Sequence, residues 1–305
     1  MKKTALITGG SGLVGTHLTD WLIAQGQEVV HLSTRNTYKP TNAAVGCAYW
    51  DPENGQMDAA VLKEVDVIYH LAGASVSKRW TPAYKQAILQ SRLRSTQTLW
   101  NALNSAEHSV RQILSASAVG IYPTSEQTLY REDAEPAHDF LGSVTQHWER
   151  KVQDMAKDIG IPFCILRIGI VLSKNGGALQ EMAPVFKWGL GTPLGNGKQW
   201  MSWIHADDLA RQFHFCAEQK LQGIFNAGGP EPATNADFSR ALASALKRPY
   251  PFSWMGVPGG ALKMVLGEKA TLALMSQKTS DEKIRGCGFT YVHSDLHGAL
   301  AAIYR

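Results

Sequence analysis

Residues 4–15 read TALITGGSGLVG, a short apolar stretch that runs into a glycine-rich turn. We expect a strand over residues 4–8 and a helix directly after the turn. In this arrangement Gly12 lets backbone N–H groups approach a pyrophosphate, and Gly15 lets the helix pack closely on the strand. The stretch therefore predicts a dinucleotide-binding loop; the alternative is an ordinary strand–helix turn. The residues expected to line the phosphates are Gly9, Ser11, Gly12, Leu13, Val14 and Gly15.

The composition of the 305-residue chain is typical of a soluble globular protein, with 44% hydrophobic and 18% charged residues. The net charge of +4 is mild and no run of Lys or Arg occurs, so we expect neither a nucleic-acid nor a membrane partner. The apolar stretch after Met1 is too short for a secretory signal, and the four cysteines have no metal or redox spacing. We therefore expect a cytoplasmic protein.

Strand-like and helix-like stretches alternate along the first half of the chain. After the opening unit, strands are expected at residues 28–32, 67–71, 112–116 and 163–168, and long helices at 81–103 and 144–159. Thr81 is expected to cap the first long helix, with Pro82 at its first position, and Gly160 to end the second. The alternation predicts an α/β fold, a Rossmann-type doubly wound parallel sheet with helices on both faces.

Beyond about residue 173 the pattern becomes rich in loops. We expect residues 1–172 to form the cofactor-binding domain, with 203–228 returning to it. Residues 173–305 are expected to form mainly a smaller substrate-side lobe, with an extension from about 255. Elements expected here are helices at 207–218, 236–246 and 261–266, and short strands at 224–226 and around Tyr291.

The end of the second expected strand reads Leu32-Ser33-Thr34-Arg35-Asn36. An acidic residue at this place binds the ribose 2′-hydroxyl of NAD, whereas an arginine accommodates the 2′-phosphate of NADP. No carboxylate occurs here, and Arg35 with Ser33 and Thr34 suits a phosphate dianion. We therefore expect NADP as the cofactor; the alternative is that Arg35 is an ordinary solvated loop residue.

Several motifs together resemble the extended short-chain dehydrogenase/reductase superfamily. They are Thr8-Gly9-x-x-Gly12-x-x-Gly15, His70-Leu71-Ala72-Gly73, residues 115–122 (SASAVGIY) and residues 203–209 (WIHADDL). A narrower resemblance, to the bacterial NAD(P)-dependent "epimerase family" of sugar-epimerase-like, cell-division-inhibitor-like proteins, is carried by Trp50-Asp51-Pro52, Arg79-Trp80-Thr81, Gln90-Ser91-Arg92, Gly176-Gly177-Ala178-Leu179 and Gly267-Glu268. The resemblance covers essentially the whole chain. It implies an epimerase-like fold, NADP(H) binding, a small-molecule substrate and a homodimer, but no established reaction.

Catalysis in the superfamily normally rests on a tyrosine four residues before a lysine, whose charge lowers the phenol pKa. None of the nine tyrosines in this chain has a lysine four residues on. An alignment through Trp148-Glu149 places Leu141 at the tyrosine position and Thr145 at the lysine position. The resemblance implies that Ser117 takes the serine position, which holds the reacting oxygen. The usual proton relay is absent.

Two explanations stay open. In the first, Tyr122 carries the proton and the chain is an atypical oxidoreductase or epimerase of a small polar or sugar-nucleotide-like substrate; a tyrosine at this place also commonly packs its ring and hydrogen-bonds its hydroxyl. In the second, the fold keeps the cofactor without hydride chemistry and serves as an NADPH-responsive sensor or partner-binding protein. The first is the leading expectation.

Further cofactor contacts are expected where other strands end. Leu71-Ala72-Gly73 offers small residues that let backbone approach the cofactor, and Arg167 and Gly169 are expected on the nicotinamide side. Arg92 and Arg94 on the long helix, and Arg79 before it, are candidate contacts for an anionic substrate in the cleft, or exposed residues.

Two groups of side chains have simpler alternatives. Trp188, Trp200 and Trp203 form either a wall for a sugar or nucleobase or the packing of a small domain. His293 and His297 share a helical spacing, but the sequence offers no third ligand nearby, so we expect no metal site.

Overall fold

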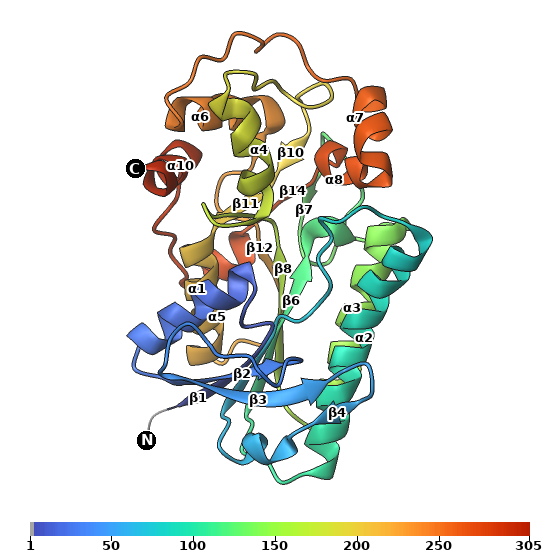
Figure 1. Cartoon of the computed structure of the whole chain (residues 1–305), viewed down its shortest axis with the longest axis vertical. Coiled ribbons are helices and arrows are strands. Elements are labelled where there is room, and N and C mark those ends of the chain that lie inside the picture. The colour runs from blue at the N-terminus through green and yellow to red at the C-terminus, as the bar shows by residue number, and fades with distance from the viewer. Residues whose placement is uncertain (1–2) are drawn as a thin grey trace.

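A sheet of eight strands forms the lower half of the computed structural model, which describes residues 3–305 (Figure 1). Neighbouring strands run parallel, except that β4 is antiparallel to β3. In spatial order the strands are β12 (Gly223–Ala227), β8 (Phe163–Ile168), β6 (Gln112–Ala118), β5 (Val67–His70), β1 (Thr4–Thr8), β2 (Glu28–Ser33), β3 (Val45–Asp51) and β4 (Gln56–Met57). The predicted Rossmann-type sheet is confirmed.

Two pairs of helices cover the two faces of the sheet (Figure 1). Helices α1 (Leu13–Ala24) and α5 (Ala206–Glu218) pack on one face, and α2 (Pro82–Ser105) and α3 (Phe140–Ile159) pack on the other. The Thr81 hydroxyl accepts the Tyr84 N–H at the start of α2, and Gly160 ends α3 with φ +73°. These ends confirm the predicted caps.

The upper part of the molecule encloses a separate apolar core around Phe186, Trp203, Phe238 and Leu300. Its helices are α4 (Gly177–Lys187), α6 (Asn235–Ala245), α7 (Gly259–Leu266), α8 (Ala270–Leu274) and α10 (Leu296–Tyr304). Short strand pairs join it to the sheet: β9 (Ile170–Leu172) with β11 (Trp203–His205), β10 (Trp200–Met201) with β13 (Ala233–Thr234), and β7 (Leu129–Tyr130) with β14 (Lys278–Thr279). The remaining elements are α9 (Glu282–Gly286) and the 3-10 turns η1 (Ala59–Lys63), η2 (Val119–Ile121) and η3 (Gly267–Lys269).

Two local expectations were wrong. No strand forms around Tyr291, because the backbone of this segment is bound by a side chain: the Asp208 carboxylate accepts the N–H groups of Val292 and His293. Helix α3 begins at Phe140, four residues before the predicted start, because the Asp139 carboxylate accepts the Gly142 N–H and caps the helix there. Within residues 3–305, no helix combines the length and apolar character that a membrane span requires.

Candidate cofactor and active site

The glycine-rich turn lies where the strand order reverses. Strand β1 pairs with β2 on one side and β5 on the other, so the carboxyl ends of these strands open the crevice that binds ligands in doubly wound sheets. Gly9 has φ +72°, and an added Cβ would lie 3.1 Å from the Leu71 backbone. At Gly15 a Cβ would collide with the Gly9 carbonyl oxygen. Both glycines are therefore required for the turn to lie between β5 and α1.

The start of α1 has the features of an anion site. Its N-cap is Gly12, which has no side chain to accept the first N–H groups, and the Gly12 N–H itself is bonded to the Gly9 carbonyl at 2.9 Å. Leu13 and Val14 follow as the first helical residues, whose N–H groups have no partner inside a helix. A phosphate placed here would accept these N–H groups and meet the positive end of the helix dipole.

A buried hydrogen-bond chain fixes the facing strand end. The Thr8 hydroxyl oxygen accepts the N–H groups of Leu71 at 3.0 Å and Ala72 at 3.1 Å, so its proton is left to donate to His70 Nδ1, 2.9 Å away. His70 Nε2 then donates to the Thr96 hydroxyl at 3.1 Å. Burial, with a smaller contribution from Arg92, lowers the pKa of His70 to about 3, so the ring is neutral. The loop that follows β5 is thereby held against the end of β1.

Arg35 lies exposed just beyond β2. Its N–H is bonded to the Ser33 hydroxyl at 3.1 Å, and no ion pair engages its guanidinium within residues 3–305. No acidic residue occurs at this strand end, residues 32–36. The donor set therefore suits a phosphate better than a ribose hydroxyl.

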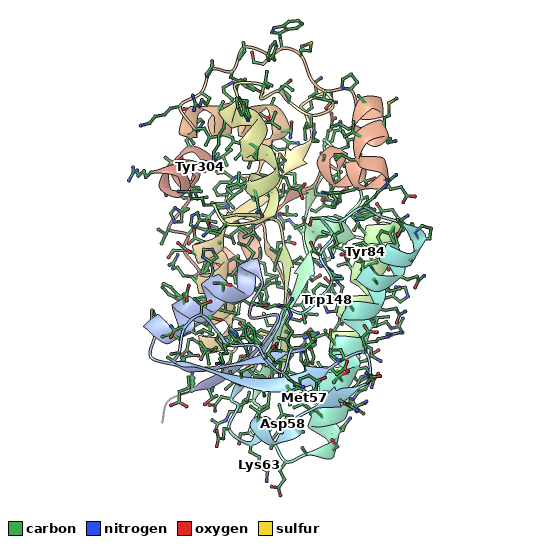
Figure 2. All side chains as sticks on the ribbon, in the orientation of Figure 1. Met57, Asp58, Lys63, Tyr84, Trp148 and Tyr304 are labelled. Carbon is green, nitrogen blue, oxygen red and sulfur yellow. The ribbon has the colours of Figure 1, made fainter. Side chains whose placement is uncertain are left out.

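A second arginine lies beside the Leu71–Gly73 loop. Arg92 Nη1 donates to the Ala74 carbonyl at 3.2 Å and to the Ile88 carbonyl at 2.8 Å, and its guanidinium lies 5.0 Å from the centre of the Trp148 ring. Figure 2 labels Trp148, which projects from α3 toward the sheet. Gly73 makes room for this arrangement, because a Cβ there would lie 3.1 Å from Arg92 Cζ. No carboxylate within residues 3–305 lies at ion-pair distance from Arg92, and burial lowers its pKa to about 10.

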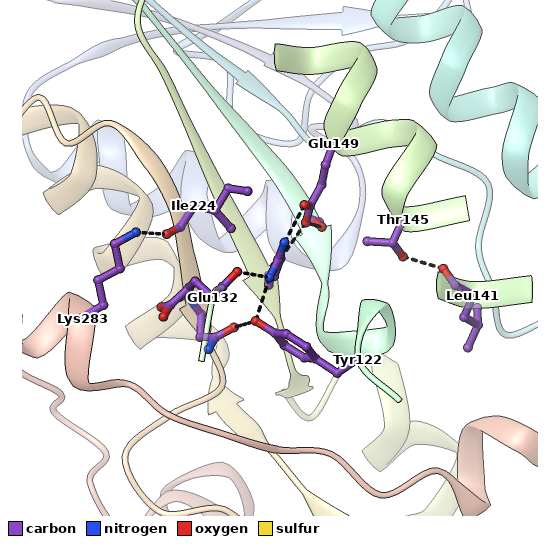
Figure 3. Close-up of polar contacts among 10 residues, drawn as sticks. Tyr122, Glu132, Leu141, Thr145, Glu149, Ile224 and Lys283 are labelled. Carbon is purple, nitrogen blue, oxygen red and sulfur yellow. Dashed lines mark hydrogen bonds and ion pairs between the residues drawn. The ribbon is translucent and has the colours of Figure 1, made fainter. Parts of the chain in front are cut away.

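Ser117 is buried and belongs to the polar network that also contains Glu149 and Tyr122 (Figure 3). Its hydroxyl donates to Glu149 Oε1 at 2.5 Å, and the same carboxylate receives Arg167 Nε and Nη2, each at 2.9 Å. Burial opposes the charge of Arg167, but the hydrogen bond and charge of Glu149 outweigh it and raise the arginine pKa above its ordinary value. Glu149 is the partner that sequence reasoning missed, although it lies one helical turn beyond Thr145.

Tyr122 closes the same network. Its hydroxyl donates to Asn226 Oδ1 at 2.7 Å and accepts from Arg167 Nη1 at 2.9 Å (Figure 3). Its ring stacks on that of Tyr130. The side chain is 1% exposed. Burial raises the Tyr122 pKa to about 12, against a partial opposing effect of Arg167. A tyrosine in this state holds its proton at neutral pH.

The start of α3 carries no titratable pair facing this network. Leu141 packs with Trp80, Ile88 and Val144, and the Thr145 hydroxyl donates to the Leu141 carbonyl at 2.8 Å (Figure 3). An apolar side chain and a hydroxyl bonded to the backbone of its own helix cannot exchange protons as a phenol and an ammonium do.

Gly169, another expected cofactor contact, lies where two backbone segments approach closely. A Cβ at this position would collide with the Ser202 carbonyl, so Gly169 lets β8 continue into β9 beside β11.

Trp203 is fully buried in the upper core, Trp188 is 81% exposed, and Trp200 donates its indole N–H to the Glu126 carbonyl at 2.8 Å. The three tryptophans therefore do not form one wall.

Comparisons with known proteins agree with this architecture. The model of the NAD dependent epimerase/dehydratase family matches residues 5–228, and a domain of unknown function, DUF1731, matches residues 257–303. Epimerase family proteins of Staphylococcus aureus and Staphylococcus epidermidis are 35% and 36% identical to the chain, over 98% of both chains in each case.

Solved structures extend the likeness. A human epimerase family protein, SDR39U1 isoform 2 with NADPH, is 30% identical and has a TM-score of 0.86 over 99% of both chains. A UDP-glucuronic acid 4-epimerase from Bacillus cereus, in complex with UDP-glucuronic acid and NAD, has a TM-score of 0.75 at 20% identity and is similar in fold alone.

Proposed function

The chain belongs to the NAD-dependent epimerase/dehydratase family, and on that premise we propose that it binds NADP(H) and acts as an atypical oxidoreductase or epimerase of a small polar or sugar-nucleotide-like substrate. The observation that carries the proposal is the uncapped start of α1, held by Gly9 and Gly15 against the loop after β5. This geometry fits a diphosphate.

Arg35 supports NADP rather than NAD. Its guanidinium is exposed at the end of β2, and residues 32–36 include no acidic side chain that would bind a ribose hydroxyl. The human relative with NADPH agrees with this choice. We propose that Arg35 binds the 2′-phosphate, that residues 9–15 bind the diphosphate, and that Leu71, Ala72, Gly73 and Gly169 lie along the nicotinamide half.

When bound, the nicotinamide accepts or supplies a hydride. We propose that Ser117 orients the reacting oxygen, which requires its hydroxyl to turn from Glu149 toward the substrate. Tyr122 is the proposed proton carrier, with Arg167 stabilising its phenolate. The Tyr122 pKa of about 12 disfavours fast proton transfer at neutral pH, so we expect turnover by this enzyme to be slow.

A second candidate function is favoured by the same network. The hydroxyls of Ser117 and Tyr122 already have buried protein partners, and Leu141 and Thr145 supply no proton relay. A chain that keeps the cofactor site and lacks a free acid or base suits an NADPH-responsive sensor or partner-binding protein. The homodimer and the cytoplasmic location implied by the resemblance stay predictions.

Two experiments distinguish the enzyme from the sensor. The first is calorimetric titration with NADPH, NADP⁺ and NADH. The second is a screen of nucleotide sugars for changes in nicotinamide absorbance. Tight binding of NADPH with turnover that falls in Ser117→Ala and Tyr122→Phe supports the enzyme. Binding that selects one redox state, with no turnover on any substrate, supports the sensor. Absence of heat with either NADPH or NADP⁺ refutes both.

A further inference from the structure

Outside the cofactor crevice, two imidazoles and a carboxylate converge from three parts of the chain. His205 ends β11, Asp207 lies in the first turn of α5, and His293 belongs to the segment before α10. Each offers one ligand atom, and these atoms all lie within 4.8 Å of one another. The two imidazole rings face each other with their centres 3.8 Å apart. The third ligand that the sequence did not reveal for His293 is thus supplied by residues more than eighty positions away.

The backbone around this group is held by a buried carboxylate. Asp208 is fully buried, accepts the N–H groups of Val292 at 2.9 Å and His293 at 2.8 Å, and also receives Arg211 Nη1 at 2.6 Å. His205 is fixed in register with Leu172 by the pairing of β11 with β9. The backbone positions of both histidines are therefore fixed by other parts of the fold.

A third histidine orients the carboxylate. His17, in the second turn of α1, has Nδ1 2.9 Å from Asp207 Oδ1 and Nε2 3.2 Å from the Ser173 hydroxyl. The other carboxylate oxygen, Oδ2, lies 3.7 Å from His205 Nδ1. That separation is too long for a hydrogen bond, and it is close to the roughly 3.4 Å between two ligands of a tetrahedral Zn²⁺ ion with bonds of about 2.0–2.1 Å.

The protonation states agree with metal ligation. Burial, followed by the neighbouring His293, lowers the pKa of His205, so its ring is neutral near pH 7. The hydrogen bond from His17 is the main cause that lowers the pKa of Asp207, which is therefore ionised. A transition metal needs a neutral imidazole and an ionised carboxylate, and neither requires a pKa change here. Ligation through His205 Nδ1 would replace the 3.2 Å hydrogen bond that this atom accepts from the Asp207 N–H, and the stacked, half-exposed His293 ring would turn so that one of its nitrogens points at the ion.

We propose that His205, Asp207 and His293 bind a divalent first-row transition ion of the Zn²⁺ type, with His17 as the outer partner that orients Asp207. Two nitrogens and one oxygen suit Zn²⁺ and its neighbours, whereas Mg²⁺ and Ca²⁺ prefer all-oxygen sites. The half-exposed position of His293 and the exposure of Asp207 leave the remaining coordination position to water. The bound ion ties the segment before α10 to the start of α5 and thereby joins the upper lobe to the sheet.

The test uses the full chain after treatment with a chelator. Calorimetry with Zn²⁺, and visible absorption with Co²⁺ as the spectroscopic probe, are expected to show one ion per chain, with no comparable binding of Mg²⁺. His293→Ala and Asp207→Asn are each expected to weaken Zn²⁺ binding at least tenfold. Zn²⁺ should raise the melting temperature of the parent chain more than that of either variant.

The matched control is His297→Ala, since His297 is exposed on α10 four residues from His293 and outside the cluster. It is expected to bind Zn²⁺ as tightly as the parent chain. The proposal is overturned if the parent chain binds no Zn²⁺, or if His293→Ala and His297→Ala bind it equally well, which would mark surface binding by scattered histidines. Because His293 is only half-buried and Asp207→Asn is nearly isosteric, loss of folding in both variants is not expected, and the Co²⁺ spectrum of the parent chain reports the ligand set independently.

Discussion

Glu149 and Arg167 meet at two points, with Arg167 Nε 2.9 Å from Glu149 Oε1 and Nη2 2.9 Å from Oε2. Both side chains are about 95% buried, since their exposed fractions are 5% and 6%. The pair joins α3 to β8. It also decides the state of the two candidate hydroxyls, because Ser117 donates to one partner and Tyr122 accepts from the other.

Removing one charge from this pair should be costly. Glu149→Gln keeps the shape of the side chain but leaves the Arg167 charge buried without a counter-ion, which costs about 3 kcal/mol of unfolding free energy. Urea denaturation measures the loss. The control is Glu53→Gln, which breaks an exposed pair with Arg94 and should cost less than about 1 kcal/mol. Equal losses of unfolding free energy in the two variants would show that the buried pair stabilises the fold no more than the exposed pair does.

Arg35 should decide between the two nicotinamide cofactors. Arg35→Ala removes a charge-assisted bond to the 2′-phosphate, worth about 1.5–3 kcal/mol, so NADPH affinity should fall roughly 10- to 100-fold. Affinity for NADH, which lacks that phosphate, should stay the same. Arg111→Ala is the control. Arg111 is 81% exposed just before β6, at the amino ends of the strands and so opposite the carboxyl ends where the cofactor is expected. An unchanged NADPH affinity in Arg35→Ala would remove the argument for NADP.

The sheet and the first turn could be predicted because their signals are local. Gly12 and Gly15 approach the backbone of Gly9 and Gly10 within the turn itself, Gly9 has a positive φ, and the apolar strands are continuous in the sequence. Helix ends were predictable where a side chain bonds its own helix, as at Thr81. The start of α3 does not follow from the apolar pattern, because a single capping carboxylate, that of Asp139, sets it.

The polar site was less predictable because its contacts join distant residues. Ser117 was singled out as a site residue, but its partner Glu149 lies 32 positions away. Trp203 lies in the upper core and Trp188 is exposed, because Trp203 belongs to β11, which pairs with β9, whereas Trp188 follows the end of α4. His293 lacked a third ligand in the sequence for the same reason.

His70 should make stability depend on pH. Its pKa is about 3 in the folded chain and about 6.5 when exposed, so between these values the unfolded state binds one more proton. The contribution is therefore fully present above pH 6.5 and is lost as the pH falls, by about 2 kcal/mol from pH 7 to pH 5. Urea denaturation at both pH values should show that His70→Asn loses about that much less than the parent chain.

Other histidines with lowered pKa values, His31, His205 and His214, are present in both proteins, so the difference isolates His70. The same loss of stability in both proteins would mean that His70 takes up a proton in the folded state. NMR titration of the His70 ring, expected to stay neutral down to pH 4, checks this directly.

Arg92 offers a test that separates a binding role from a structural one. Its guanidinium has only carbonyl partners and an aromatic face, and burial lowers its pKa to about 10, so the folded chain gains little from its charge. Arg92→Met should therefore change the unfolding free energy by less than about 1 kcal/mol, or raise it. A positive charge beside the Leu71–Gly73 loop, with no carboxylate partner within residues 3–305, is expected to bind an anionic ligand, and in Arg92→Met NADPH affinity should fall at least tenfold. Arg94→Met, on the same helix and facing Glu53, should change neither quantity. A destabilised Arg92→Met that binds NADPH normally would instead make Arg92 a packing residue of α2.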